Sequence, residues 1–255
     1  MSSIYFRETG SGRPLIFLHG FCDTHELWTE FVKPFTTTNH VITPDLPGFG
    51  RSSSLPGALT IDLVADALAE WMNDLSIQQP VIVGHSLGGY VALSLLARYP
   101  KILSSIVLFH STPYPDSAER KKVRDKVVAF VTEHGVEPFI ETFVPGLFLD
   151  KASPYIAATH ERTSKTTSQA LISYARAMRE RPDRSTAVIQ DGRPVLVIAG
   201  TNDTLIPIDD LRKFAKMSGK ISLQELSNAA HMGIFEAKSH CQALIRGFAD
   251  AVQLN

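Results

Sequence analysis

Ser86 lies between glycines in the sequence Gly84-His85-Ser86-Leu87-Gly88-Gly89. Residues 80–83, directly before Gly84, are mostly β-branched and predict a buried strand. Residues 90–99, followed by Pro100, predict a helix. A G-x-S-x-G sequence between a strand and a helix is the nucleophile elbow, a sharp turn that presents the serine hydroxyl at the positive end of a helix. The pentapeptide also arises by chance in glycine-containing loops, but its flanking elements indicate that Ser86 is a nucleophile.

A nucleophilic serine needs a base and an acid that orients the base. His231 stands in a loop after the last expected strand and before the last helix, where it can reach Ser86. Asp203 follows the apolar run 195–199. It could also be a turn residue, since aspartate favours Asx turns. The chain order serine, aspartate, histidine is the order expected with this elbow, and we therefore predict that Ser86, Asp203 and His231 form a triad. Asp209 is better explained as a first-turn helix residue.

The oxyanion of an acyl-transfer reaction requires backbone donors. Leu87, the residue after the nucleophile, supplies one, and the loop that follows an early strand supplies the other, with the Phe21 amide as the expected donor. Cys22 comes next but has no partner motif, and we interpret it as an inert, semi-buried thiol.

The other eight histidines are assigned different roles. His110 ends a strand on the same edge and is a candidate pocket residue, although it comes too early in the chain for the base. His19 and His85 are interpreted as loop residues beside glycine turns. The remaining five are expected to be surface or packing residues: His25, His40, His134, His160 and His240.

Short apolar runs alternate with helical patterns along the chain. Strands are predicted near 15–18, 40–44, 80–83, 105–109, 194–199 and 221–226, and helices near 60–75, 90–99, 209–217 and 236–252. This alternation predicts an α/β fold with a mostly parallel, doubly wound sheet. Such sheets place their chemistry beyond the carboxyl ends of the strands.

Residues 113–190 interrupt the alternation, since they contain no convincing strand and show helical patterns at 117–133, 137–143 and 168–180. We therefore expect an α/β core formed by residues 1–112 and 191–255, with the segment between them, residues 113–190, forming a helical cap above Ser86. Some of its apolar residues are expected to line a substrate pocket and others to pack cap helices together: Phe130, Phe139, Phe143, Leu147, Phe148, Leu171, Tyr174 and Met178. The pocket candidates are His110, Phe139, Phe143 and Leu147.

The composition is that of an ordinary globular protein, with 255 residues, 44% hydrophobic and 20% charged. A net charge of −1 gives no reason to expect nucleic acid or an anionic membrane as partner. Cys22 and Cys241 have no metal-ligand spacing, so neither a metal nor a cofactor is expected. The first residues lack the apolar segment of a signal peptide, which favours a cytoplasmic location. The sequence does not indicate an oligomeric state.

Taken together, these motifs resemble those of the α/β-hydrolase superfamily, in its serine carboxylesterase-like branch with a helical cap. The resemblance rests on the strand followed by His19-Gly20-Phe21, on Asp45 to Ser52, on the elbow, on Gly200 to Asp203 and on Ala229 to Met232. It implies that Ser86, Asp203 and His231 are catalytic, that Phe21 and Leu87 form the oxyanion hole, and that a small ester or lactone is cleaved through an acyl-enzyme without a cofactor. A serine at the elbow argues against the haloalkane dehalogenase and epoxide hydrolase branches, which use aspartate there.

Three alternatives stay open. Residues 110–113 and the basic helix that begins near Glu119 are similar to those of the menaquinone-pathway synthase, a lyase, although that branch usually has arginine where this chain has Tyr90. Carbon–carbon bond hydrolysis can use the same triad. A ligand receptor can also retain a vestigial triad.

Overall fold

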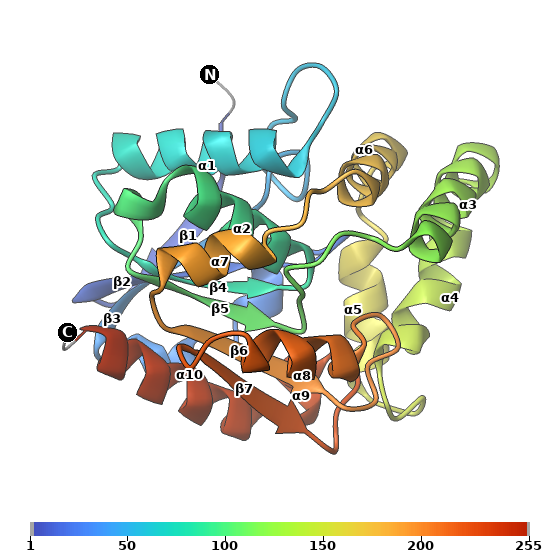
Figure 1. The fold of residues 1–255 in the computed structure, drawn as a ribbon. Helices are drawn as coiled ribbons and strands as arrows, with labels where there is room; N and C mark the ends of the chain where they lie inside the picture. The colour runs from blue at the N-terminus through green and yellow to red at the C-terminus, as the bar shows by residue number, and fades with distance from the viewer. Residues whose placement is uncertain (1–2, 254–255) are drawn as a thin grey trace.

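A seven-stranded sheet forms the centre of the molecule (Figure 1). The computed structural model describes residues 3–253. The strand order is β1-β3-β2-β4-β5-β6-β7, and every neighbouring pair is parallel except β1 with β3. The strands are β1 (Phe6–Thr9), β2 (Arg13–Leu18), β3 (Asn39–Pro44), β4 (Val81–His85), β5 (Ser105–Phe109), β6 (Val195–Gly200) and β7 (Ile221–Leu226).

Helices cover both faces of this sheet. One face packs against α1 (Ile61–Asp74), α2 (Leu87–Arg98), α7 (Ser185–Asp191) and α8 (Ile208–Lys216). The other packs against α10 (Lys238–Gln253) and the short helices η1 (His25–Trp28) and η2 (Lys33–Phe35). Two further short helices are η3 (Pro100–Ile102) and α9 (Gly233–Glu236). The predicted doubly wound α/β fold is therefore confirmed, and it is explained by central strands that are apolar along their whole length.

Two elements of the core differ from the sequence prediction. Strand β1 was not predicted because its residues, Phe6 to Thr9, are half-buried or exposed and show no apolar run. It pairs antiparallel with β3, Phe6 opposite Pro44, at the edge of the sheet. Helix α2 begins at Leu87 rather than at residue 90, because the glycines after Ser86 already adopt helical conformation.

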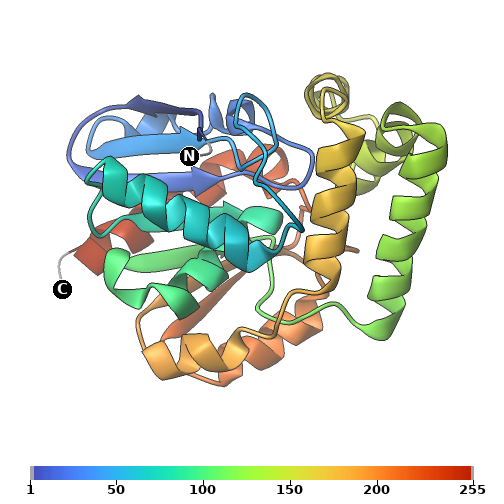
Figure 2. The same cartoon turned by 90° about the horizontal axis from the view of Figure 1, so that it is seen from above.

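The segment between β5 and β6 contains helices and no strand, as predicted. Helices α3 (Ala118–His134), α4 (Glu137–Leu147), α5 (Tyr155–Thr163) and α6 (Ser168–Arg179) stand together beside the sheet (Figure 2). We call these four helices the helical insertion. The fifth helix, α7, packs against α2 on the sheet instead, so the expected boundary at residue 190 is too late.

No helix within residues 3–253 has both the length and the apolar character needed to cross a membrane.

Candidate active site

Ser86 occupies a strained turn between β4 and α2. Its φ of 50° and ψ of −111° lie outside the regions that most side chains adopt. The turn also requires close backbone approaches: a Cβ on Gly84 would lie 2.4 Å from the Gly88 backbone, and one on Gly88 would lie 2.4 Å from the Leu18 carbonyl oxygen. The glycines of the elbow are thus explained by space, and the turn has the conformation expected for a nucleophile elbow.

Hydrogen bonds from neighbouring strand ends hold this turn in place. The Ser86 amide donates to the Phe109 carbonyl at 2.9 Å, and the Ser111 hydroxyl donates to the Ser86 carbonyl at 2.8 Å. The Ser86 side chain lies at the first turn of α2, and the residue lines a cavity. It therefore combines access to a ligand with the positive end of a helix.

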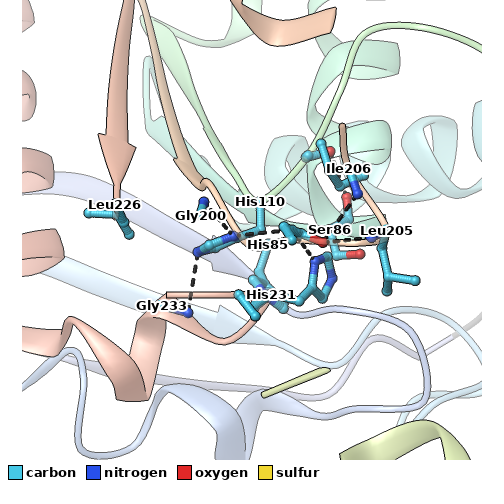
Figure 3. Close-up of polar contacts among 12 residues, drawn as sticks. His85, Ser86, His110, Gly200, Leu205, Ile206, Leu226, His231 and Gly233 are labelled. Atoms are coloured by element: carbon cyan, nitrogen blue, oxygen red, sulfur yellow. Dashed lines mark hydrogen bonds and ion pairs between the residues drawn. The ribbon is translucent and has the colours of Figure 1, made fainter. Parts of the chain in front are cut away.

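His231 and Asp203 form a buried hydrogen bond. Figure 3 shows His231 close to His85 and Ser86 of the elbow. His231 Nδ1 lies 2.7 Å from Asp203 Oδ2, and Asp203 Oδ1 accepts the Leu205 and Ile206 amides at 2.8 and 3.1 Å. The backbone of His231 is anchored by His85, whose Nε2 donates to the His231 carbonyl at 3.0 Å. With its Nδ1 proton directed to Asp203, His231 keeps Nε2 free to accept a proton.

His110 is a second partner of Asp203. Its Nε2 accepts the Gly233 amide at 3.2 Å, and its Nδ1 faces both Asp203 Oδ2 and the Gly200 amide nitrogen, each at 3.3 Å. A neutral ring that accepts at Nε2 carries its proton on Nδ1, so it donates to Asp203 and does not accept the Gly200 amide. The side chain has no exposed surface. The prediction that His110 lines the pocket is therefore wrong. Its backbone has a φ of 50°, and its ring is buried against Asp203.

These contacts set the charge of the acid. Burial raises the pKa of Asp203, but attraction to His231 and hydrogen bonds from His110 and His231 outweigh it and hold this pKa well below its usual range. Burial lowers the pKa of His110 despite its bond to Asp203. The pair at neutral pH is therefore an ionised Asp203 with a neutral His110.

Two histidines interpreted as loop residues are buried anchors of the site; His19 does lie in the loop after β2, whereas His85 belongs to a strand. His85 is the last residue of β4, and burial, assisted by repulsion from His231, holds its pKa well below normal. His19 Nε2 accepts the Leu46 amide at 2.9 Å, and its Nδ1 donates to the Gly20 carbonyl at 2.8 Å. Burial lowers the pKa of His19 as well. Both rings fix backbone next to the elbow.

The expected oxyanion donors lie at the carboxyl edge of the sheet, Phe21 in the loop after β2 and Leu87 at the first residue of α2. Within residues 3–253 no protein acceptor is found for the Phe21 or Leu87 amide. Cys22, with a φ of 62°, is fully buried, and burial raises its pKa well above normal, as expected for an inert thiol. That these two amides bind an oxyanion stays a prediction.

The helical insertion holds the loop that carries Phe21. Thr166 Oγ1 donates to the Cys22 carbonyl at 3.0 Å. Arg162, on α5, binds both carboxylate oxygens of the buried Asp23, with Nη2 3.0 Å from Oδ2. A bidentate pair of this kind fixes geometry as well as charge.

A cavity of about 260 Å³ opens beside Ser86, between the sheet and the helical insertion. Phe139 and Phe143 line it, as predicted, and their rings lie 6.1–6.4 Å from the ring of Phe21. The prediction for Leu147 is wrong: it is buried outside the cavity, where its carbonyl accepts the His231 amide at 2.9 Å. The lining residues are Phe21, Ser86, Tyr90, Arg120, Val123, Arg124, Val127, Phe139, Thr142, Phe143, Met178, Leu205 and Ile206.

A second cavity of about 200 Å³ adjoins the first and shares Tyr90, Arg120, Leu205 and Ile206 with it. Arg120 belongs to the basic helix noted in the sequence, but neither it nor Arg124 was predicted to line a pocket. Residues 120, 123, 124 and 127 recur at helical spacing on one face of α3, and this spacing is the signal that could have identified them.

His110, Asp203 and His231 also form the only cluster in residues 3–253 whose donor atoms are close enough to suggest a metal site. Their geometry does not fit one. His231 Nδ1 and Asp203 Oδ2 are 2.7 Å apart, whereas ligands of a tetrahedral zinc ion lie roughly 3.3 Å from one another. The three side chains are engaged in hydrogen bonds among themselves and with backbone amides.

Comparison with known proteins agrees with this fold and geometry. The family model for the alpha/beta hydrolase fold matches residues 13–238. The chain therefore belongs to the α/β-hydrolase family, and it is a hydrolase enzyme.

Curated relatives of similar length include two hydrolytic enzymes. The chain is 29% identical over 245 residues to a putative carbamate hydrolase, RutD, of Pseudomonas syringae, with 92% of each chain covered. It is 27% identical to the pimeloyl-[acyl-carrier protein] methyl ester esterase of Sodalis glossinidius, covering 96% of this chain and 97% of the relative. A longer relative is the dihydrolipoyllysine-residue acetyltransferase component of the acetoin cleaving system of Cupriavidus necator. It is 24% identical, and the chain spans 65% of its length.

Solved structures of the same fold include a thermophilic esterase from Thermogutta terrifontis. It superposes with a TM-score of 0.92 at 28% identity, covering 98% of this chain and 94% of the esterase. The enol-lactonase from Burkholderia xenovorans superposes with a TM-score of 0.88 at 20% identity, covering 97% of this chain and 96% of the enol-lactonase. The second likeness supports the fold alone.

Proposed function

We propose that the protein hydrolyses small carboxylic esters or lactones through an acyl-enzyme formed on Ser86. One observation carries the proposal: His231, bonded through Nδ1 to the ionised Asp203, is anchored by His85 next to the Ser86 elbow. The relatives that are esterases agree with this chemistry.

In the proposed mechanism, His231 Nε2 accepts the Ser86 proton as the hydroxyl oxygen attacks the ester carbonyl. The Phe21 and Leu87 amides donate to the oxyanion of the tetrahedral intermediate. His231 then gives its proton to the leaving alcohol, which leaves the acyl group on Ser86. A water that loses its proton to His231 attacks this acyl group, and the acid is released as Ser86 recovers its proton.

In this mechanism the helical insertion acts as a cap. It covers the cavity beside Ser86 with Phe139 and Phe143, and it holds the loop of Phe21 through Arg162 and Thr166. The apolar lining favours a substrate with an apolar stretch next to the scissile bond.

The kinetics of Ser86→Ala and His231→Ala with p-nitrophenyl esters test the proposal. We expect each change to lower kcat by about a millionfold, because the two side chains act as one unit. The matched control is His240→Ala, on the exposed part of α10, which we expect to be nearly neutral. Retention of wild-type rates in Ser86→Ala would exclude the triad, and covalent product retained without turnover would indicate a ligand receptor.

A further inference from the structure

The cavity beside Ser86 is mainly apolar, yet arginines reach it from α3. Arg120 and Arg124 line this cavity, and Arg120 and Arg181 line the adjoining one. One acid serves two of these three arginines: Asp116 Oδ2 accepts Arg124 Nε at 3.0 Å, and Asp116 Oδ1 accepts Arg181 Nη1 at 2.5 Å. Asp116 is buried, and its single negative charge is shared between these two partners.

Arg120 is left without an acidic partner among the described residues. Its Nη2 donates to the Leu205 carbonyl at 2.6 Å, and among residues 3–253 no carboxylate lies within ion-pair distance of it. The one other acid that lines either cavity, Asp210, pairs with Lys213 at 3.1 Å. Burial, followed by repulsion from Arg124, lowers the pKa of Arg120, and the nearby Tyr90 and Asp116 offset only part of this.

We propose that Arg120 binds a carboxylate group of the substrate, at the far end of an apolar stretch that lies against Phe139 and Phe143. The guanidinium group has five N–H donors in a planar fork that fits a carboxylate, and four of them are not used by Leu205. This inference rests on the proposed function for the ester bond, and it assigns the substrate class: half-esters of dicarboxylic acids.

Paired substrates of equal chain length test this specificity. Mono-p-nitrophenyl adipate and mono-p-nitrophenyl suberate carry the carboxylate, while p-nitrophenyl hexanoate and p-nitrophenyl octanoate lack it. In at least one of the two pairs, we expect the wild-type protein to have a higher kcat/KM for the acidic ester than for the neutral one. In Arg120→Gln the ratio of kcat/KM, acidic over neutral, should fall on the order of tenfold to a hundredfold, since a charged hydrogen bond is lost.

Two further variants serve as controls. Arg120→Lys keeps the charge but not the fork, so it should retain part of the preference. Lys122→Gln removes an exposed charge from the same helix, outside both cavities, and should leave the ratio unchanged. The proposal is overturned if Arg120→Gln has the same ratio of kcat/KM, acidic over neutral, as the wild-type protein, with circular dichroism showing that the variant is folded.

Binding separates this proposal from the proposed function. If no ester is cleaved, the proposed function fails while the anion site is still measurable. Adipate should then raise the Tm of the wild-type protein and of Lys122→Gln, but not of Arg120→Gln. An equal rise in all three, or in none, refutes the carboxylate site.

Discussion

Asp203 receives four hydrogen bonds, two on each carboxylate oxygen, from His231, His110, Leu205 and Ile206. This arrangement keeps the acid ionised and prevents its rotation, which in turn fixes the His231 ring and its tautomer. The Asp203 side chain therefore needs two oxygen acceptors to hold His231 in this orientation.

Asp203→Asn is expected to lower kcat by about 10⁴-fold, because an amide NH₂ group replaces one acceptor and disfavours the productive tautomer of His231. Steady-state hydrolysis of p-nitrophenyl esters measures the loss. Asp209→Asn is the matched control, since Asp209 is exposed and pairs with Arg212 on the surface. A larger loss in the control than in Asp203→Asn would assign the acid to another position.

The proposed triad residues Ser86, Asp203 and His231 could be singled out from sequence because each follows a readable strand and keeps the expected chain order. His110 could not be placed in the same way. Its position at the end of β5 was clear, but the inward direction of its ring depends on a φ of 50° that no local pattern indicates. Arg120 has no carboxylate partner because Asp116 bonds to Arg124 and Arg181 instead. Tertiary packing determines these partners, so the sequence does not indicate them.

At the scale of elements, the helical insertion and the core meet at a buried ion pair. Asp23 belongs to the loop after β2 and is 4% exposed, and its partner Arg162 belongs to α5. The pair links the position of the insertion to the loop that carries the Phe21 amide.

Arg162→Met should lower the free energy of unfolding by about 3–5 kcal/mol, because it leaves the Asp23 charge buried and unpaired. Urea unfolding measures the change. The double variant Asp23→Leu with Arg162→Met should recover much of the loss. Arg212→Met, which removes an exposed pair with Glu225, should cost no more than about 1 kcal/mol. A loss in Arg162→Met as small as in this control contradicts the account of the interface.

The elements themselves were predicted unevenly. The strands β2 to β6 contain apolar runs that a sequence pattern identifies, whereas β7 has apolar residues mainly at its ends. Strands β5 and β7 have the predicted bounds. Helix α5 was missed because much of its surface is exposed and only Thr159 and Thr163 are buried. Helix α7 was assigned to the insertion because nothing in its seven residues shows that they pack on α2.

At the scale of the whole molecule, several buried titratable groups favour the same pH range. His19, His85 and His110 have lowered pKa values because burial disfavours their charged form. Asp45 and Asp203 have lowered pKa values because hydrogen bonds and nearby histidines outweigh burial. In every case the unfolded chain binds more protons than the folded protein as the pH falls.

The free energy of unfolding should therefore decrease in two stages on acidification. The histidine contribution is present above their unfolded pKa of about 6.5 and declines below it, and the aspartate contribution declines below about pH 4. Urea unfolding between pH 8 and pH 3 at constant ionic strength measures both stages. A free energy of unfolding that stays constant or rises between pH 7 and pH 5 is incompatible with neutral, buried histidines.

The central claim is that Ser86 is the nucleophile, and covalent labelling tests it most directly. The wild-type protein is treated with a fluorophosphonate and digested, and the modified peptide is identified by mass spectrometry. We predict a single adduct on Ser86, which is absent in Ser86→Ala and forms far more slowly in His231→Ala. An adduct on another residue, or equal labelling of Ser86→Ala, would contradict the account.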